Sequence, residues 1–357
     1  MLKDLSQAKT LSKKYQIPLE DILLIALNCS GINADLSDKR IRFRLKLDGC
    51  KEEFYIGVCV NTGESPFYFR VNDLFLNKEH IGKIIEREND TCDSTYFRRN
   101  KTAMTLNSNS RSRCFGCKFC GTYNLDAEDL NSLLLQQKLS NYFKKFLAQN
   151  KIKDLSNFVD IGICTGCFLS EELTVDHILM VRNVLKRFKF DKELKYLGSQ
   201  IRSENSFKIL KEKAMPFSLY LTIEVFNNRE KWLRSSKADV TINEAKNILK
   251  LSAKYGFEYT FLYILGIEPV DVVIKRFKEF APLINSRFPI INLFQIYIPN
   301  QRKYRAKNAD KIEYYLKVRK ELEKIFKKKK MRPRPWEDYR GLWYLRFGNE
   351  PIKDYRI

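Results

Sequence analysis

Short apolar segments alternate with longer amphipathic segments from about residue 102 onward, and this rhythm constrains the fold more than any other feature of the sequence. Such alternation is typical of strand–helix units that build a parallel sheet. Predicted strands occupy residues 102–107, 158–164, 194–198, 217–224, 259–265 and 291–298. Predicted helices include 126–149, which Asp126 can cap, 171–188, 242–255 and 270–284. Six units are too few to close an eight-stranded barrel, so the sequence predicts an α/β fold with an open, partial (β/α)6 TIM-like barrel.

Two further segments flank the predicted barrel at residues 101–300. Residues 1–100 predict a small α+β N-terminal domain with helices at 2–15 and after Pro18, and strands at 40–47, 54–60 and 67–71. The strand at 40–47 has one apolar face and one basic face, the latter made of Arg40, Arg42, Arg44 and Lys46. A solvated edge strand with repelling charges explains this basic face, and phosphate contact is the alternative. Residues 301–357 predict a C-terminal extension with a charged helix at 309–330 and an aromatic tail at 336–347 that packs on the barrel.

The composition limits the compartment and the partners. The chain carries 65 Lys and Arg against 43 Asp and Glu, a formal charge of +22, which favours acidic or phosphate-bearing partners; a generally lysine-rich composition explains the charge equally well. Nine cysteines, an odd number, disfavour a secreted disulfide framework and suit a reducing cytoplasm. No apolar run is long enough to cross a membrane. With only two histidines, His80 and His177, a histidine-based metal site or triad is improbable, and we expect His177 on a helix surface or in packing.

Three cysteines crowd into the loop that follows the first predicted strand. Cys114, Cys117 and Cys120 are separated by two residues each, the spacing of the first three cluster ligands in bacterial ferredoxins. A ferredoxin run would continue with Cys-Pro, but this chain has Asn124 and Leu125 there. Three thiolates on a [4Fe–4S] cluster leave one iron open, so we interpret the loop as a site where a cofactor or substrate meets metal. Four other cysteines are scattered and are interpreted as packing or surface residues: Cys29, Cys50, Cys59 and Cys92.

A three-cysteine loop after the first strand of a six-unit barrel resembles the radical S-adenosylmethionine superfamily over roughly residues 100–300. Phe119, directly before the last cysteine, matches the aromatic residue usual in that family. The family loop is Cys-x3-Cys-x2-Cys, whereas here only two residues separate Cys114 from Cys117, giving Cys-x2-Cys-x2-Cys. The ferredoxin spacing indicates that the shorter gap can still hold a cluster.

Later strand ends carry further matches to the same family. After the second strand, where the family places Gly-Gly-Glu beside the methionine amino group, this chain has Thr165 and Gly166. Glu224 ends the fourth strand, as in relatives that bind the ribose hydroxyls there, and Arg234 follows at the interval of an arginine that pairs with the methionine carboxylate. Gly266 ends the fifth strand, where the resemblance implies the adenine site.

The resemblance implies a [4Fe–4S] cluster that reductively cleaves S-adenosylmethionine to a 5′-deoxyadenosyl radical, which abstracts hydrogen from a substrate. It also implies an electron donor such as flavodoxin or ferredoxin. The substrate class stays open among small molecules, nucleotides and peptides, and the positive charge favours an acidic or phosphate-bearing one. The reaction type cannot be read from a fold that supports many chemistries.

Three alternatives accompany this interpretation. Cys164 and Cys167 form another Cys-x2-Cys pair that could complete a zinc site with Cys114 and Cys117, although the interval is long and Cys120 is left over; burial at a strand end is their simpler explanation. Glu224 and Arg234 could form a structural ion pair. The basic strand and overall charge allow an RNA-directed protein, either an RNA-modifying radical enzyme or a zinc-bearing binder, although no RNA-binding module is recognisable.

Overall fold

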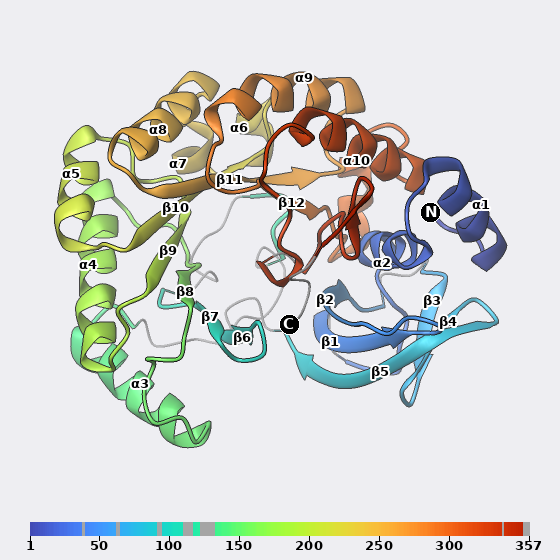
Figure 1. The fold of residues 1–357 in the computed structure, drawn as a ribbon, viewed down its shortest axis with the longest axis horizontal. Coiled ribbons are helices and arrows are strands. Elements are labelled where there is room, and N and C mark those ends of the chain that lie inside the picture. Colours follow the sequence, from blue (N-terminus) through green and yellow to red (C-terminus); the bar gives the residue numbers. More distant parts are fainter. Residues whose placement is uncertain are drawn as a thin grey trace.

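The computed structural model describes residues 1–37, 40–61, 65–90, 95–109, 117–121, 133–337 and 339–352. Its largest sheet has seven strands in the order β12-β11-β10-β9-β8-β7-β6 and curls into a half-barrel (Figure 1). Neighbouring strands from β7 to β12 are parallel, and only β6 pairs in the antiparallel sense. The strands are β6 (Tyr96–Arg98), β7 (Ala103–Leu106), β8 (Asp160–Ile163), β9 (Glu193–Gly198), β10 (Phe217–Glu224), β11 (Glu258–Leu265) and β12 (Ile290–Leu293). A mixed α/β fold with a partial barrel is therefore confirmed.

Helices line the outer side of the curled sheet (Figure 1). They begin where the sequence offers caps: the Ser170 side chain accepts a hydrogen bond from the Leu173 amide, and Thr241 forms a capping box with Glu244. The first part of the helix predicted at 126–149, with its proposed cap Asp126, lies outside the described residues. The helices are α3 (Gln136–Gln149), α4 (Glu171–Arg187), α5 (Glu204–Lys213), α6 (Arg229–Trp232), α7 (Ser235–Ala238), α8 (Ile242–Lys254), α9 (Val270–Phe280), η3 (Ala281–Leu283), η4 (Pro299–Tyr304) and α10 (Ile312–Phe326).

A five-stranded sheet in the order β2-β1-β5-β4-β3 lies at the open side of the half-barrel (Figure 1). It follows helices α1 (Leu5–Tyr15) and α2 (Leu19–Ser30) and consists of β1 (Arg40–Leu47), β2 (Glu53–Cys59), β3 (Phe67–Arg70), β4 (Asp73–Leu76) and β5 (Glu79–Asn89). The prediction that the basic strand is a solvated edge is wrong, because β1 lies between β2 and β5. Its arginines face carboxylates on the neighbouring strands: Arg44 pairs with Glu53 and Glu86 at 3.7 and 3.5 Å.

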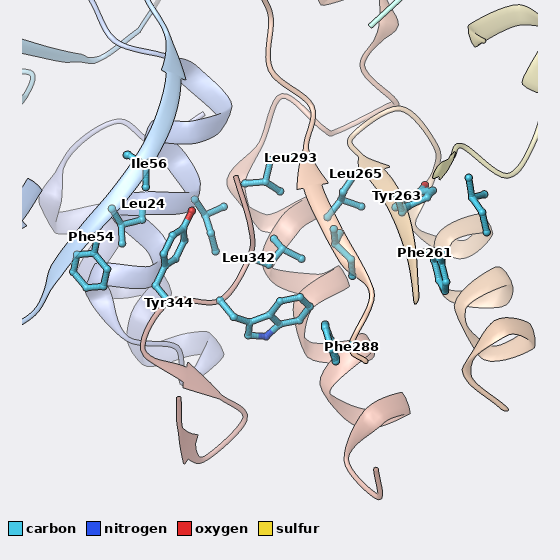
Figure 2. Packing of buried hydrophobic residues seen from close by; sticks show 14 of the residues in the cluster. Leu24, Phe54, Ile56, Phe261, Tyr263, Leu265, Phe288, Leu293, Leu342 and Tyr344 are labelled. Atoms are coloured by element: carbon cyan, nitrogen blue, oxygen red, sulfur yellow. The ribbon is translucent and has the colours of Figure 1, made fainter. Parts of the chain in front are cut away.

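The C-terminal segment joins the two sheets. It contains η5 (Pro335–Glu337), β13 (Arg346–Phe347) and β14 (Glu350–Pro351). The Tyr344 ring meets Phe54 of β2 edge-on at 6.0 Å, and Figure 2 shows it beside Leu24 and Ile56, while Leu342 lies nearer Leu293 of β12. Trp343 and Tyr344 are both buried. Trp343 meets Phe288, directly before β12, edge-on at 5.2 Å, which confirms the predicted packing on the barrel for this residue, whereas Tyr344 packs on the N-terminal sheet. One continuous hydrophobic cluster includes residues of the N-terminal sheet, the half-barrel and this tail.

Inside the half-barrel, the amino-terminal ends of the strands are filled by an ionic network. Asp160 of β8 accepts hydrogen bonds from Arg98 at 2.6 Å and from Lys195 at 2.9 Å, and Lys195 also contacts Glu337 of the C-terminal segment. Buried charges require such pairing because each loses its hydration. The network closes this end, so space for a ligand lies toward the carboxyl ends of the strands. No helix within the described part of the chain is long and apolar enough to cross a membrane.

Candidate active site

A cavity of about 210 Å³ lies within the curl of the half-barrel. Its inner wall is formed by side chains of the parallel strands, namely Leu197 of β9, Thr222 and Glu224 of β10, Leu262 and Ile264 of β11, and Ile290 and Asn292 of β12. The cysteine turn, the loop after β8 and residues from both flanking segments complete the lining. Polar groups therefore surround an apolar base at the carboxyl ends of the strands, where enzymes of related folds place their sites.

Cys117 and Cys120 both line this cavity. The Cys120 amide donates to the Cys117 carbonyl at 3.0 Å, which bends the chain into a turn and brings two thiols to one side. Residues on either side of the turn hold it in place: the Lys118 amide donates to the Trp232 carbonyl at 3.0 Å, and the Gln301 side chain donates to the Lys118 carbonyl at 2.9 Å. The third predicted ligand, Cys114, lies outside the described residues.

The Cys117 thiol is buried and interacts with the segment between α6 and α7. Its Sγ accepts a hydrogen bond from the Arg234 amide at 3.5 Å. Burial raises the pKa of Cys117 to about 11, and nearby Lys237 offsets only part of that shift. Binding to a cationic metal centre would replace the proton, because the thiolate is the ligand form of cysteine.

Glu224 ends β10 in an unusual conformation. Its φ is 68°, in the left-handed region, and the pairing with β11 shifts register between Thr222 and Glu224. Non-glycine residues rarely occupy this region; those that do lie in turns and helix ends, and also at active sites. The carboxylate lines the cavity and accepts a hydrogen bond from Lys237 Nζ at 2.9 Å.

Lys237 is therefore a partner of Glu224 that the sequence did not suggest. It lies in α7, thirteen positions after Glu224, in a chain with 65 basic residues, so no local signal distinguished it. Arg234 directly precedes α7, and its amide contacts Cys117. Arg234 is not among the described residues that line the cavity.

Thr165 and Gly166 lie directly after β8. Thr165 lines the cavity, and its hydroxyl donates to the Gly166 carbonyl at 3.0 Å. The Gly166 amide donates to the Asn109 carbonyl at 3.0 Å, which ties this loop to the segment that follows β7. His177 supports the same region: its Nε2 lies 2.7 Å from Ser108 Oγ, and the ring is buried against Phe168, so the expected packing role is confirmed.

Gly266 has a structural reason to be glycine. Its φ is +121°, and a Cβ added there would lie 3.0 Å from Tyr315 Oη and 3.2 Å from Phe294 Cβ. The Ala306 amide donates to its carbonyl at 2.8 Å. Gly266 therefore lies behind the cavity wall, between Phe294 and the helix α10, and is not among the described lining residues.

Glu268, two residues later, is another residue for which the sequence predicted no role. Its carboxylate accepts hydrogen bonds from the Phe226 and Asn227 amides, both at 2.8 Å, and from the Tyr263 hydroxyl at 2.9 Å. Burial raises the pKa of Glu268. These bonds fix the loop that follows Glu224, so Glu268 positions the end of β10 from behind.

Phe119 is buried and faces the cavity, as part of a small hydrophobic cluster with Trp232, Ile264 and Phe294. Cys164 and Cys167 line the cavity as well, so four cysteine side chains border one space. No group of three or more His, Cys, Asp or Glu side chains within the described ranges is close enough together to hold a metal ion. The cluster therefore requires Cys114, whereas the zinc alternative loses support, because three of its four ligands, Cys117, Cys164 and Cys167, do not form such a group.

No protein-family model matches the chain, and no curated protein matches it. Among solved structures it is similar to SuiB from Streptococcus suis, at 14% identity and a TM-score of 0.39 over 60% of this chain and 46% of SuiB. The structure of SuiB bound to S-adenosylmethionine gives 13% identity and a TM-score of 0.37, over 56% of this chain and 43% of SuiB. MlghC, the GDP-mannoheptose C4 reductase from Campylobacter jejuni with NADP bound, is 16% identical, with a TM-score of 0.15, over 50% of this chain and 59% of MlghC. The matches span less than half of SuiB, and at these TM-scores none assigns the chain to a family.

Proposed function

We propose that this chain is a radical S-adenosylmethionine enzyme built on a partial (β/α)6 barrel. The proposal is carried by one observation, namely that predicted cofactor-binding residues from several strand ends line the same cavity. The loop after β7 brings Cys117 and Cys120, the loop after β8 brings Thr165, and the end of β10 brings Glu224 to a single cavity at the carboxyl ends of the strands. These residues are distant in sequence, and each was selected from the sequence for a cofactor role.

The donor set fits the two cofactors. Two thiols side by side are soft ligands suited to iron, and Cys114 would supply the third thiolate of a [4Fe–4S] cluster. Glu224 can accept both ribose hydroxyls of S-adenosylmethionine, with Lys237 holding its carboxylate in place. When bound, the cluster would supply the electron that cleaves the sulfonium and starts hydrogen abstraction.

The remaining predicted residues have supporting parts in this proposal. Thr165 and Gly166 would meet the methionine amino group, and Phe119 would cover the cysteine turn on its apolar side. Arg234 would serve the methionine carboxylate, while its amide already holds Cys117. Gly266 would act near the adenine by letting the end of β11 pack closely on Phe294.

The chain also protects the cavity from water. Arg40, Asp90 and Tyr96 of the N-terminal part and Tyr339 and Arg340 of the C-terminal segment cover the open side of the half-barrel. A reactive radical needs such shielding, because water and stray side chains would consume it. An electron donor such as flavodoxin or ferredoxin would supply the electrons from outside.

The test is anaerobic purification and cluster reconstitution, followed by counting of iron and sulfide and incubation with S-adenosylmethionine and dithionite. We expect about four irons per chain and formation of 5′-deoxyadenosine. Replacing Cys114, Cys117 and Cys120 together by alanine should abolish both, while Cys167→Ala should retain the cluster. Cys50→Ala, whose thiol lies outside the cavity lining, is the matched control. Zinc in place of iron, or a cluster that survives the triple replacement, would refute the proposal.

The RNA-directed alternative draws no support from β1. Besides the pairs of Arg44, Arg40 Nε lies 2.7 Å from Asp90, and the Arg42 side chain is buried beside Asp90 and Glu88. Three of the four basic side chains of this face are thus paired with carboxylates, and the fourth, Lys46, is exposed.

A further inference from the structure

The cysteine turn at residues 117–120 has two sides. Cys117, Phe119 and Cys120 line the cavity, whereas Lys118 does not and is exposed to solvent. The backbone amide and carbonyl of Lys118 are both hydrogen-bonded, the amide to α6 and the carbonyl to η4. The turn therefore presents thiols to the cavity and a lysine to the surface of the protein.

Two more lysines lie around this outer side. The rings of Trp232 in α6 and Tyr304 in η4 meet edge-on, with their centres 5.4 Å apart. Lys231 Nζ lies 4.8 Å from the centre of the Trp232 ring, and Lys303 Nζ lies 5.6 Å from the centre of the Tyr304 ring. Both lysines are exposed. Because the Trp232 carbonyl also binds the Lys118 amide, Lys118, Lys231 and Lys303 surround one small area, which we name the lysine face.

The charge of the lysine face is not neutralised locally. Within the described part of the chain, no carboxylate forms an ion pair with any of its three lysines, in contrast to Lys237, which is paired with Glu224. The elements that carry the face are themselves basic, since α6 and η4 together contain four basic residues and one acidic residue, Glu230. The face therefore presents a positive field to solvent, which attracts an acidic partner.

The positive surface continues beyond η4 into a hollow of about 440 Å³. Arg305 and Lys307 line it, and Asp310 is the one carboxylate among its described lining residues. Ile296 lines the hollow as well and belongs to the same hydrophobic cluster as Cys117. The hollow and the cysteine turn thus share one packed support, so a partner seated on the lysine face has further cationic surface beside it.

Two kinds of acidic macromolecule could use such a surface, a protein or an RNA. An RNA strand binds by stacking its bases on exposed aromatic rings, but Trp232 is buried and Tyr304 half-buried, so neither ring is fully open to a base. A redox partner has a specific reason to bind here, because electrons cross a protein quickly only over short distances and the cysteine turn reaches the surface at Lys118. Weak encounters between redox proteins also need only a small interface.

We infer that the lysine face is the docking surface for an acidic one-electron carrier protein of the flavodoxin type. The inference rests on the proposed function, because only an enzyme with a cluster at the cysteine turn needs an electron at this position. One electron would pass from the reduced flavin of the carrier to the cluster, so that the carrier is oxidised by one electron and the cluster reduced by one. No bond forms or breaks between the two proteins.

Binding is tested by NMR titration of an acidic flavodoxin, in its oxidised state, with the full chain purified anaerobically. We expect the dissociation constant to rise about tenfold between about 20 and 300 mM salt, because salt screens the attraction between exposed charges. The triple variant Lys118→Glu, Lys231→Glu, Lys303→Glu should bind at least about tenfold more weakly at low salt. Replacing the same three lysines by glutamine should weaken binding several-fold and provides a second route should the glutamate variant fail to fold.

The matched control reverses three exposed lysines of α5, on the outer side of the half-barrel (Figure 1), as Lys208→Glu, Lys211→Glu, Lys213→Glu. It changes the net charge by the same amount, yet it should alter the affinity less than about twofold, because charge pairs at an interface act locally. On the reconstituted protein, the second-order rate of reduction by reduced flavodoxin should fall in the lysine-face variants. Reduction by the methyl viologen radical, a small cation that needs no docking surface, should not fall.

Unchanged affinity in the glutamate variant, an equal loss in the α5 control, or equally tight binding of the basic carrier cytochrome c would overturn the inference. RNA binding that the same variants abolish would also overturn it. Iron content and 5′-deoxyadenosine formation with dithionite are measured separately. A chain that binds flavodoxin through the lysine face but holds no cluster would refute the proposed function alone, and a chain with a cluster but no flavodoxin binding would refute the docking surface alone.

Discussion

Replacing Glu224 tests the cofactor role and the backbone conformation in one series. Glu224→Gln keeps the shape of the side chain but removes the charge that would accept the ribose hydroxyls. A hydrogen bond to a charged group contributes about 1.5–3 kcal/mol, so the dissociation constant of S-adenosylmethionine should rise about tenfold to one hundredfold. Equilibrium dialysis with the reconstituted protein measures it. Unchanged affinity would refute the assignment of Glu224 to the cofactor.

Two smaller replacements isolate the conformation. Glu224→Ala and Glu224→Gly both remove the carboxylate and leave Lys237 Nζ, now 2.9 Å from its partner, without it. This cost is common to the two variants and cancels in their comparison. At a φ of 68°, glycine is free of the Cβ clash that costs alanine about 1 kcal/mol. The glycine variant should therefore melt about 2 °C higher than the alanine variant.

Calorimetry or circular dichroism on the two variants decides this point. Both should have lost affinity for S-adenosylmethionine to the same extent, because neither has an oxygen to offer. Equal melting temperatures would show that the left-handed conformation of residue 224 stores no strain, and the argument that links it to function would fail.

Three other predictions concern packing, pH and partners. Gly266→Ala should lower the free energy of unfolding by about 1–3 kcal/mol in urea titrations, since the new Cβ would lie 3.0 Å from Tyr315 Oη. The control Gly49→Ala is also at positive φ but has open space around it, so it should lower the free energy of unfolding by only about 1 kcal/mol. Burial lowers the pKa of His177 to about 4, so the unfolded chain binds a proton near pH 6.5 that the folded chain does not. The protein should thus lose up to about 3 kcal/mol of stability as the pH falls from about 6.5 to 4, and His177→Gln should flatten this slope; equal slopes would contradict the assignment. Because the arginines of β1 are paired, gel-shift assays at about 150 mM salt should show no RNA binding, and retention that falls steeply with salt would revive the RNA alternative.

The strands of the half-barrel were predictable because their burial is nearly complete. β10 has the predicted bounds, and all eight of its residues are buried, so a predominantly apolar segment identified it. The run at 291–298 looks equally apolar, yet the strand ends at Leu293. Gln295 Nε2 then donates to Asn28 Oδ1 at 3.1 Å and to the Gly57 carbonyl at 2.6 Å. A local sequence pattern cannot predict such long-range contacts. β4 and β5 were missed because their segments, 73–76 and 79–89, are short or rich in charge.

The candidate site likewise contains residues that the sequence predicted and residues that it did not. Cys117 and Cys120 were found from their spacing, and Thr165 and Glu224 because each lies at the end of a predicted strand; the topology of parallel strands brings these positions together. Lys237, Arg340 and Tyr339 were not found, because their place depends on tertiary contacts. Spacing in the sequence indicates where a loop begins, but not which distant side chain it meets.

The cavity takes its lining from Arg40 near one end of the described chain to Arg340 near the other. Only a fragment that spans at least residues 40–340 therefore contains the whole lining. A piece limited to the half-barrel would keep the cysteine turn and Glu224 but leave the cavity open to bulk solvent along one side. The complete cavity requires both flanking segments to be docked, so replacing either segment would change the space that the strand ends enclose.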